Sequence, residues 1–230
     1  MIIAGLQKTS LLDYPQKVSA IIFTQGCNFR CPFCYNPNLV TRIDKKDVLP
    51  QKQIFDFLTK RKRVLDAVVI TGGEPTLHKD LLKLIEKIKK LDLLVKLDSN
   101  GTNPATFKEL IDRSLIDYIA MDIKAPLRKY KKVANIKVDT ASIKASIKLI
   151  MGAGLPYEFR STILPAMHTS VDIEQMAKLI KGADKYYLQK FRPTGNLNDQ
   201  DFNVHKSYTD KQMKELSKIA KKYVTKCGVR

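Results

Sequence analysis

Three of the four cysteines lie close together, as Cys27, Cys31 and Cys34 in a C-x₃-C-x₂-C spacing. Three thiolates can bind three irons of a 4Fe–4S cluster, whereas a cluster that only carries electrons usually has four cysteine ligands. The fourth iron would then be open to a substrate. The spacing therefore indicates an iron–sulfur site that could act on a bound molecule.

Two other uses of these cysteines fit the sequence less well. A zinc site with three cysteines and one histidine has similar ligands, but the histidines, His78, His168 and His205, are distant in the sequence. A disulfide framework is typical of smaller secreted chains with more cysteines. Iron–sulfur binding is the better fit. We expect Cys227 to be a free thiol, and His168 and His205 to lie in surface loops.

Short apolar segments alternate with amphipathic ones, which is the pattern of parallel βα units. The expected strands are residues 18–24, 67–71, 93–98, 117–122, 156–162 and 185–191. The expected helices lie near residues 50–62, 78–91, 104–112, 139–151, 171–181 and 209–225. Helix caps are expected at Asp139-Thr140 and Thr169-Ser170. With no repeat, linker or change of composition, we predict one domain over residues 1–230.

Reactive or polar residues lie at the end of each of the six predicted strands or directly after it. They are the cysteine run, Gly72-Gly73-Glu74, Asp98-Ser99-Asn100, Asp122 with Lys124, Arg160, and Arg192. In βα barrels the reactive face is built from the C-terminal ends of the strands and the loops that follow them. We therefore expect these residues to surround one site.

The composition indicates where the protein is located and what kinds of partner it could bind. The chain has 230 residues and a formal net charge of +18. It has no apolar run of membrane-spanning length and no start that resembles a signal peptide, so we expect no membrane and a cytoplasmic location. The basic runs at 61–63 and 128–132 contain a single aromatic residue. A lysine-rich solvated surface is therefore favoured over nucleic-acid binding, and a basic face could also steer an acidic electron donor.

The cysteine run resembles the cluster-binding signature of the radical S-adenosylmethionine superfamily. Gly72-Gly73-Glu74-Pro75 resembles the second signature of that superfamily, in the same order along the chain. The stretch from Asp13 to Pro37 is most similar to the activating proteins of anaerobic ribonucleoside-triphosphate reductase, a glycyl radical enzyme. The resemblance implies an α/β fold, a partial (β/α)6 TIM-like barrel with a C-terminal helix, and a 4Fe–4S cluster and S-adenosylmethionine as cofactors.

The same resemblance implies a radical reaction in an anaerobic setting. The reduced cluster would cleave S-adenosylmethionine to methionine and a 5′-deoxyadenosyl radical, which would take a hydrogen from a glycine of the partner reductase. Because the cofactors carry this chemistry, no catalytic side chain is assigned. An external flavodoxin or ferredoxin would supply the electron. Two alternatives stay open: a radical enzyme acting on a small molecule or an RNA base, similar to a deazaguanine synthase, and a non-catalytic iron–sulfur module.

Roles for single residues also come from the resemblance. Cys27, Cys31 and Cys34 would bind the cluster, and Glu74, after Gly72 and Gly73, would accept a hydrogen bond from the methionine amine. Phe33 would lie against the adenine or, equally, anchor the cysteine run to the core.

The remaining predicted site residues would surround the methionine and ribose. They are Ser99, Asn100, Lys124, Arg160 and Arg192. Arg192 stands where related activases often have a histidine. Asp98 and Asp122 would offer hard oxygens to a monovalent cation. The alternative is that Asp98 belongs to a solvated turn and Asp122 to a buried ion pair with Lys124.

Overall fold

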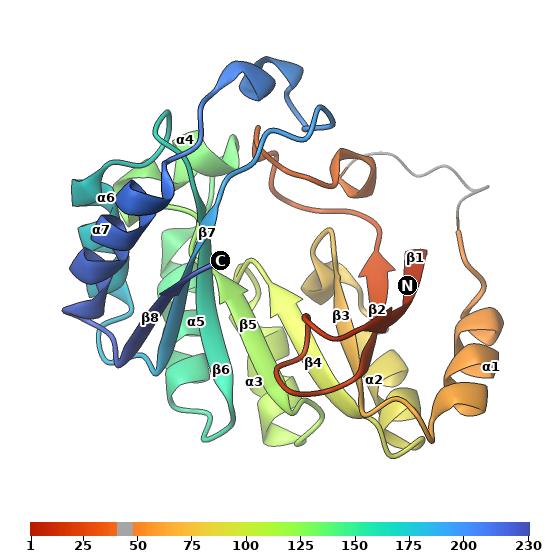
Figure 1. Ribbon diagram of the computed structural model, residues 1–230. Helices are drawn as coiled ribbons and strands as arrows, with labels where there is room; N and C mark the ends of the chain where they lie inside the picture. The colour runs from red at the N-terminus through yellow and green to blue at the C-terminus, as the bar shows by residue number, and fades with distance from the viewer. Residues whose placement is uncertain (41–47) are drawn as a thin grey trace. The chain divides into compact units, whose positions relative to one another are not determined.

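The computed structural model describes residues 1–40 and 48–230 (Figure 1). Its strands follow the order β1-β2-β3-β4-β5-β6-β7-β8 in one sheet. The chain divides into two compact units. The first unit is Met1–Asn28, Asn38–Ser99 and Ala105–Ile119, and the second unit is Phe29–Pro37, Asn100–Pro104 and Ala120–Arg230.

The first unit begins with an antiparallel pair and continues with parallel strands. Its strands are β1 (Ile3–Ser10), β2 (Ser19–Thr24), β3 (Ala67–Gly72) and β4 (Leu94–Ser99). β1 pairs antiparallel with β2, whereas β2–β3 and β3–β4 are parallel, with Ser19 opposite Ala67 and Ala67 opposite Leu94. β2 and β3 are buried almost throughout, which is why they appear in the sequence as continuous apolar runs rather than alternating ones.

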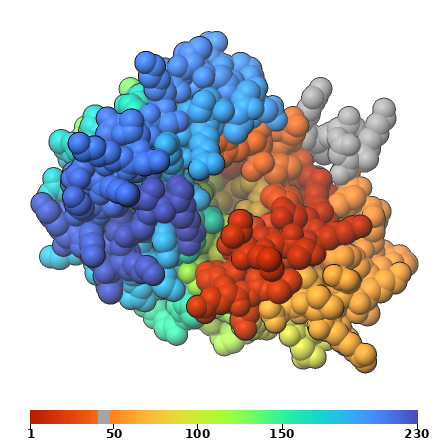
Figure 2. Space-filling model, viewed as in Figure 1, coloured from red at the N-terminus to blue at the C-terminus, as the bar shows by residue number. Residues whose placement is uncertain are grey.

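The helical segments of this unit connect its strands. They are η1 (Pro37–Leu39), α1 (Gln51–Arg61), η3 (Pro75–Leu77), α2 (Leu81–Lys89) and α3 (Pro104–Asp112), of which α3 begins in the second unit. α2 buries Leu81, Leu84, Ile85 and Ile88, and this spacing gives the helix one apolar face. The loop between β1 and β2 (red) is exposed on the face seen in Figure 2, with Leu12 91% exposed.

The second unit holds the later strands and most of the C-terminal helices. Its strands are β5 (Tyr118–Asp122), shared with the first unit, β6 (Tyr157–Ile163), β7 (Lys185–Lys190) and β8 (Lys226–Val229). β6, β7 and β8 are parallel neighbours. The helical segments are η4 (Leu127–Lys129), α4 (Tyr130–Ala134), α5 (Thr140–Met151), α6 (Ser170–Leu179), η5 (Gln200–Val204) and α7 (Asp210–Lys221). α6 and α7 pack side by side (Figure 1).

The predicted α/β class is confirmed, and the six predicted strands correspond to β2–β7 within one residue at every end. Asp139 caps α5, and Thr169 caps α6 in a reciprocal capping box with Asp172. The last helix was predicted too long, because it ends at Lys221 and is followed by β8. Strand β1 and helix α4 were not predicted. The single domain over residues 1–230 stays a prediction.

Among the residues that the structure describes, no helix is both long enough and apolar enough to cross a membrane.

Candidate cofactor site

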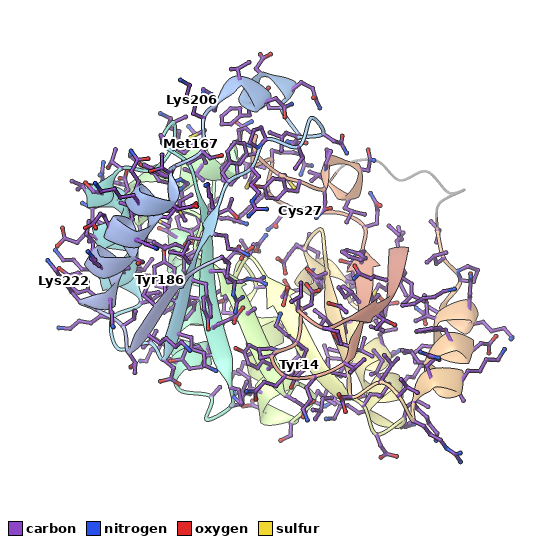
Figure 3. The ribbon with its side chains drawn as sticks, in the orientation of Figure 1. Tyr14, Cys27, Met167, Tyr186, Lys206 and Lys222 are labelled. Atoms are coloured by element: carbon purple, nitrogen blue, oxygen red, sulfur yellow. The ribbon has the colours of Figure 1, made fainter. Side chains whose placement is uncertain are left out.

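Residues 25–36 form the cysteine loop, which follows β2, and Figure 3 labels Cys27 in it. Its start belongs to the first unit, where Gly26 N–H donates to Leu39 O at 2.8 Å and Cys27 N–H donates to Val40 O at 3.3 Å. None of Cys27, Cys31 and Cys34 forms a disulfide within the described residues, and Cys31 is buried. Within the described part of the chain, no three His, Cys, Asp or Glu side chains are gathered for a metal. Cluster binding by these cysteines therefore stays a prediction.

The rest of the cysteine loop is fastened inside the second unit. Arg30 N–H donates to Ala134 O at the end of α4, at 2.8 Å. The segment after β7 returns to the loop, so that Asn198 N–H donates to Cys34 O at 3.1 Å and Asp199 N–H to Pro32 O at 2.9 Å. These bonds hold the backbone around two of the three cysteines without using their sulfur atoms.

Phe33 is a buried anchor of the cysteine loop. Its ring is 3% exposed and meets His168 and Phe191 edge-on, at centroid distances of 6.3 and 6.5 Å. Phe29 meets Tyr130 of α4 in the same way, at 6.5 Å. These contacts agree with the interpretation that Phe33 anchors the loop to the core, and its contact with adenine stays a prediction.

The Gly72-Gly73-Glu74 segment binds closely to the start of the cysteine loop within the first unit. Gly73 N–H donates to Thr24 O at 2.9 Å, and Glu74 N–H donates to Gly26 O at 2.7 Å. A Cβ at Gly73 would lie 2.0 Å from Gly26 O, and one at Gly72, whose φ is +116°, would lie 2.4 Å from Thr24 N. Both positions therefore require glycine.

Glu74 is fully buried, and its carboxylate is oriented by neighbouring polar groups. Oε1 accepts from Thr76 N–H at 3.1 Å, from Thr76 Oγ1 at 2.5 Å and from Ser99 Oγ at 2.7 Å. The structure thus brings Glu74 and Ser99 together, and their roles toward S-adenosylmethionine stay predictions. In the same unit Asp98 forms a buried ion pair with Lys96. Lys96 was not predicted, although a single lysine within an apolar strand is a detectable signal.

Asp122, Lys124 and Arg160 form an ion-pair group in the second unit. Lys124 Nζ lies 2.9 Å and Arg160 Nε 3.2 Å from the Asp122 carboxylate. Burial alone would raise the pKa of Asp122, but the charges and hydrogen bonds of Lys124 and Arg160 outweigh it and lower this pKa. Burial would lower the pKa of Lys124, but nearby Asp122, Cys31 and Cys34 raise it. Lys124 is therefore a cation close to two cysteines of the loop.

These pairs bear on the predicted cation site. Each of the two carboxylates is already bound by an amino group, Asp98 by Lys96 and Asp122 by Lys124. For Asp122 this agrees with the alternative of an ion pair with Lys124. A monovalent cation at Asp98 and Asp122 stays a prediction.

Two predicted cofactor residues lie in loops of the second unit. Asn100 is buried, and its Oδ1 accepts from Thr102 N–H at 3.0 Å and from Thr102 Oγ1 at 2.7 Å. Arg192 is exposed, and its N–H donates to the Tyr35 hydroxyl at 2.8 Å. Their roles toward the cofactor stay predictions.

The expectation that His168 lies in a surface loop is wrong. His168 is fully buried, and its Nε2 lies 2.8 Å from Lys124 O. It directly precedes Thr169, the N-cap of α6. The residue before an N-cap often packs against the helix that follows, and this position was the available signal. His205, by contrast, follows η5 and is partly exposed.

Comparisons with known proteins agree with the two sequence signatures. The "Radical SAM superfamily" model matches residues 21–181. Over its full length, the chain is 37% identical to the "Putative glycyl-radical enzyme activating enzyme" of Methanocaldococcus jannaschii and covers 95% of that protein. It is 23% identical to the pyruvate formate-lyase-activating enzyme of Clostridium pasteurianum, over 96% of each chain.

A solved structure shares the fold. SuiB of Streptococcus suis, bound to S-adenosylmethionine, matches 91% of this chain with a TM-score of 0.71 at 16% identity. The chain spans about half of SuiB, 49% of its length. At this level of identity the likeness shows a common fold.

Proposed function

This chain belongs to the radical SAM superfamily, whose cofactors are a 4Fe–4S cluster and S-adenosylmethionine, and we propose that it activates a glycyl radical enzyme. The observation that carries this proposal is the full-length similarity to an activating enzyme from M. jannaschii, at 37% identity. The similarity to the clostridial activating enzyme over almost the whole of both chains supports the same class. Within that class, the stretch from Asp13 to Pro37 favours anaerobic ribonucleoside-triphosphate reductase as the partner.

The cysteine loop offers a donor set that suits the cluster. Cys27, Cys31 and Cys34 form no disulfide within the described residues, and three thiolates are soft ligands that suit iron in such clusters. The Lys124 ammonium lies near Cys31 and Cys34, and these two cysteines contribute to the raised pKa of Lys124. When bound, the cluster supplies the electron that cleaves S-adenosylmethionine into methionine and a 5′-deoxyadenosyl radical.

The chain's own residues would bind and orient the methionine part of S-adenosylmethionine. Glu74 would accept a hydrogen bond from the methionine ammonium, with its carboxylate already oriented by Thr76 and Ser99. Glycines at positions 72 and 73 allow the backbone to approach the ligand. Lys124 and Arg160 are cations that would attract the methionine carboxylate.

The partner would supply the hydrogen atom. A hydrogen from a glycine Cα of the reductase would move to the 5′-carbon, leaving the radical on the glycine and forming 5′-deoxyadenosine. One electron from an external flavodoxin or ferredoxin would be consumed in each event. The basic chain, with a formal charge of +18, favours an acidic donor.

The test is a search for a glycyl radical by electron paramagnetic resonance. The cluster is reconstituted anaerobically with iron and sulfide, reduced, and mixed with S-adenosylmethionine and the anaerobic ribonucleotide reductase of the same organism. We expect a glycine-type doublet on the reductase, which Cys31→Ala abolishes. Formation of 5′-deoxyadenosine with no radical on the reductase would exclude this partner. An intact cluster with no cleavage would contradict the enzyme assignment.

A further inference from the structure

His168 uses both nitrogens of its imidazole ring inside the second unit. Leu164 N–H donates to Nδ1 at 3.4 Å, and Nε2 lies 2.8 Å from the carbonyl oxygen of Lys124. A backbone N–H can only donate and a carbonyl can only accept, so Nδ1 is unprotonated and Nε2 carries the proton. Burial lowers the pKa of His168, which agrees with this neutral form.

Three side chains and one backbone carbonyl, from separate elements, hold the backbone of residues 123 and 124, where β5 has ended. Lys124 N–H donates to the Tyr130 hydroxyl at 3.3 Å, while Lys124 O accepts from His168. Ile123 N–H donates to Arg160 O at 2.7 Å, and Ile123 O accepts from Ser161 Oγ at 2.5 Å. The backbone of Lys124 is therefore held by the side chains of Tyr130 and His168.

The two side chains that hold the Lys124 backbone also contact the cysteine loop. His168 meets Phe33 edge-on at 6.3 Å, and Tyr130 meets Phe29 edge-on at 6.5 Å. Phe29 and Phe33 lie on either side of Cys31 in the sequence. Lys124 and the cysteine loop thus share the same two buried supports.

We infer that His168 is a positioning residue that holds Lys124 beside Cys31 and Cys34. The inference rests on the proposed function, because it takes these cysteines to be cluster ligands. A positive charge near a cluster stabilises its reduced form, so a correctly placed Lys124 raises the reduction potential. Loss of the His168 contact would move that charge and lower the potential.

Two substitutions separate positioning from local packing. His168→Gln places an amide nitrogen near the position of Nε2 and can restore the donor to Lys124 O. His168→Asn places an amide oxygen near the position of Nδ1, so it keeps the acceptor for Leu164 N–H but loses the donor. The two variants therefore differ in the contact that the inference concerns.

The measurement is the midpoint potential of the reconstituted cluster, from a redox titration followed by electron paramagnetic resonance, without S-adenosylmethionine. We expect His168→Asn to lower the potential in the direction of Lys124→Gln, and His168→Gln to stay near the wild type. Thermal unfolding of each cluster-free variant checks the fold. If either variant fails to fold, Tyr130→Phe replaces the pair, because it removes only the acceptor of Lys124 N–H and should also lower the potential.

The outcomes distinguish this inference from the proposed function. Equal potentials in the wild type and His168→Asn would overturn the inference alone, as would a wild-type potential in Tyr130→Phe when that variant is used. A wild-type potential in His168→Asn together with a lowered potential in His168→Gln would assign His168 a local structural role and would also overturn the inference. A wild-type chain that takes up no cluster would contradict the proposed function on which the inference rests.

Discussion

The Glu74 region of the first unit and the Lys124 region of the second unit place polar groups at strand ends in different ways. Around Glu74 the backbone determines the geometry, because Gly72 and Gly73 pack too closely on residues 24 and 26 for any side chain. Around Lys124 side chains determine it, through Tyr130, His168 and Asp122. We therefore expect substitutions to act mainly through steric clashes in the first region and mainly through charge in the second.

The two regions also differ in their electrostatics. Glu74 Oε1 accepts from hydroxyl groups and a backbone N–H, whereas the Asp122 carboxylate is bound by the cations of Lys124 and Arg160. The hydroxyl and amide donors orient the Glu74 carboxylate, and this orientation suits it to accept a hydrogen bond from an ammonium group. Lys124, by contrast, is a cation that lies near Cys31 and Cys34.

The largest effect is expected in the part of the cysteine loop that the second unit holds. Cys31→Ala should abolish the iron content and the visible absorption of the reconstituted protein, because it removes one of three ligands. The matched control is Cys227→Ala in β8, which should keep the full cluster. Equal iron content in Cys31→Ala and the wild type would remove this cysteine from the site.

Steric control of the first region is tested by Gly73→Ala. The new Cβ would meet Gly26 O at 2.0 Å and Leu39 O at 3.0 Å, both on the backbone. We expect the free energy of unfolding to fall by about 1–3 kcal/mol or more, measured by urea denaturation. At Gly152, after α5, the nearest atom to such a Cβ is Lys148 O at 3.4 Å. Gly152→Ala should change stability by less than about 1 kcal/mol, and an equal loss in both variants would refute the steric account.

Glu74→Gln tests the role of the Glu74 charge in the first unit, where backbone packing determines the geometry. The amide keeps an oxygen for Thr76 and Ser99 but loses the negative charge. We expect the affinity of the cluster-loaded protein for S-adenosylmethionine to weaken by about 1.5–3 kcal/mol, the range for a charged hydrogen bond. Anaerobic calorimetry measures it, with the exposed Glu109→Gln on α3 as the control. Unchanged affinity would exclude Glu74 from the binding site.

The smallest effect, a change in the free energy of unfolding, is expected at Asp172. This carboxylate, like Asp122, forms ion pairs with cations of the second unit. It is buried and accepts from Arg128 and Lys129, the former at 3.0 Å. Burial would raise the pKa of Asp172, but the hydrogen bonds of Lys129 and Thr169 outweigh it and lower this pKa from 3.8. Because the pKa is depressed by folding, the stabilisation is present above about pH 4 and is lost as the pH falls through the folded-state pKa.

Asp172→Asn should therefore cost about 1 kcal/mol at pH 7, since the partly exposed cations are screened by solvent. The difference in the free energy of unfolding between Asp172→Asn and the wild type should disappear as the pH is lowered below the ordinary carboxyl pKa of 3.8. Urea denaturation across this range measures it, with the exposed Asp112→Asn as a control. A difference that is constant with pH would argue against a charge effect.

The sequence predicted the parts of the fold that depend on local patterns. Strands β2–β7 have apolar runs, and the caps at Asp139 and Thr169 have recognisable residues. β1 contains Gly5, Gln7 and Lys8 and lacks such a run, whereas β8 has only four residues, one of them glycine. Their hydrogen bonds to neighbouring strands, rather than their composition, define them.

The candidate site was likewise predictable only where it depends on local sequence patterns. The cysteine spacing and Gly72-Gly73-Glu74 are contiguous, so their chemistry was visible in the sequence. The role of His168 was not, because its partner Lys124 lies 44 residues away and the contact depends on how the second unit folds. The ring contact between Phe33 and His168 joins segments even farther apart in the sequence. Such contacts between distant segments explain why the supports of the site were missed.

The central claim, that this chain generates a radical which takes hydrogen from a glycine of its partner, is tested most directly by isotope transfer. Anaerobic ribonucleotide reductase labelled with glycine deuterated at Cα is activated by the reconstituted protein, and the 5′-deoxyadenosine is analysed by mass spectrometry. The account predicts 5′-deoxyadenosine that carries one deuterium. Unlabelled 5′-deoxyadenosine, formed in the same amount with and without the reductase, would contradict it.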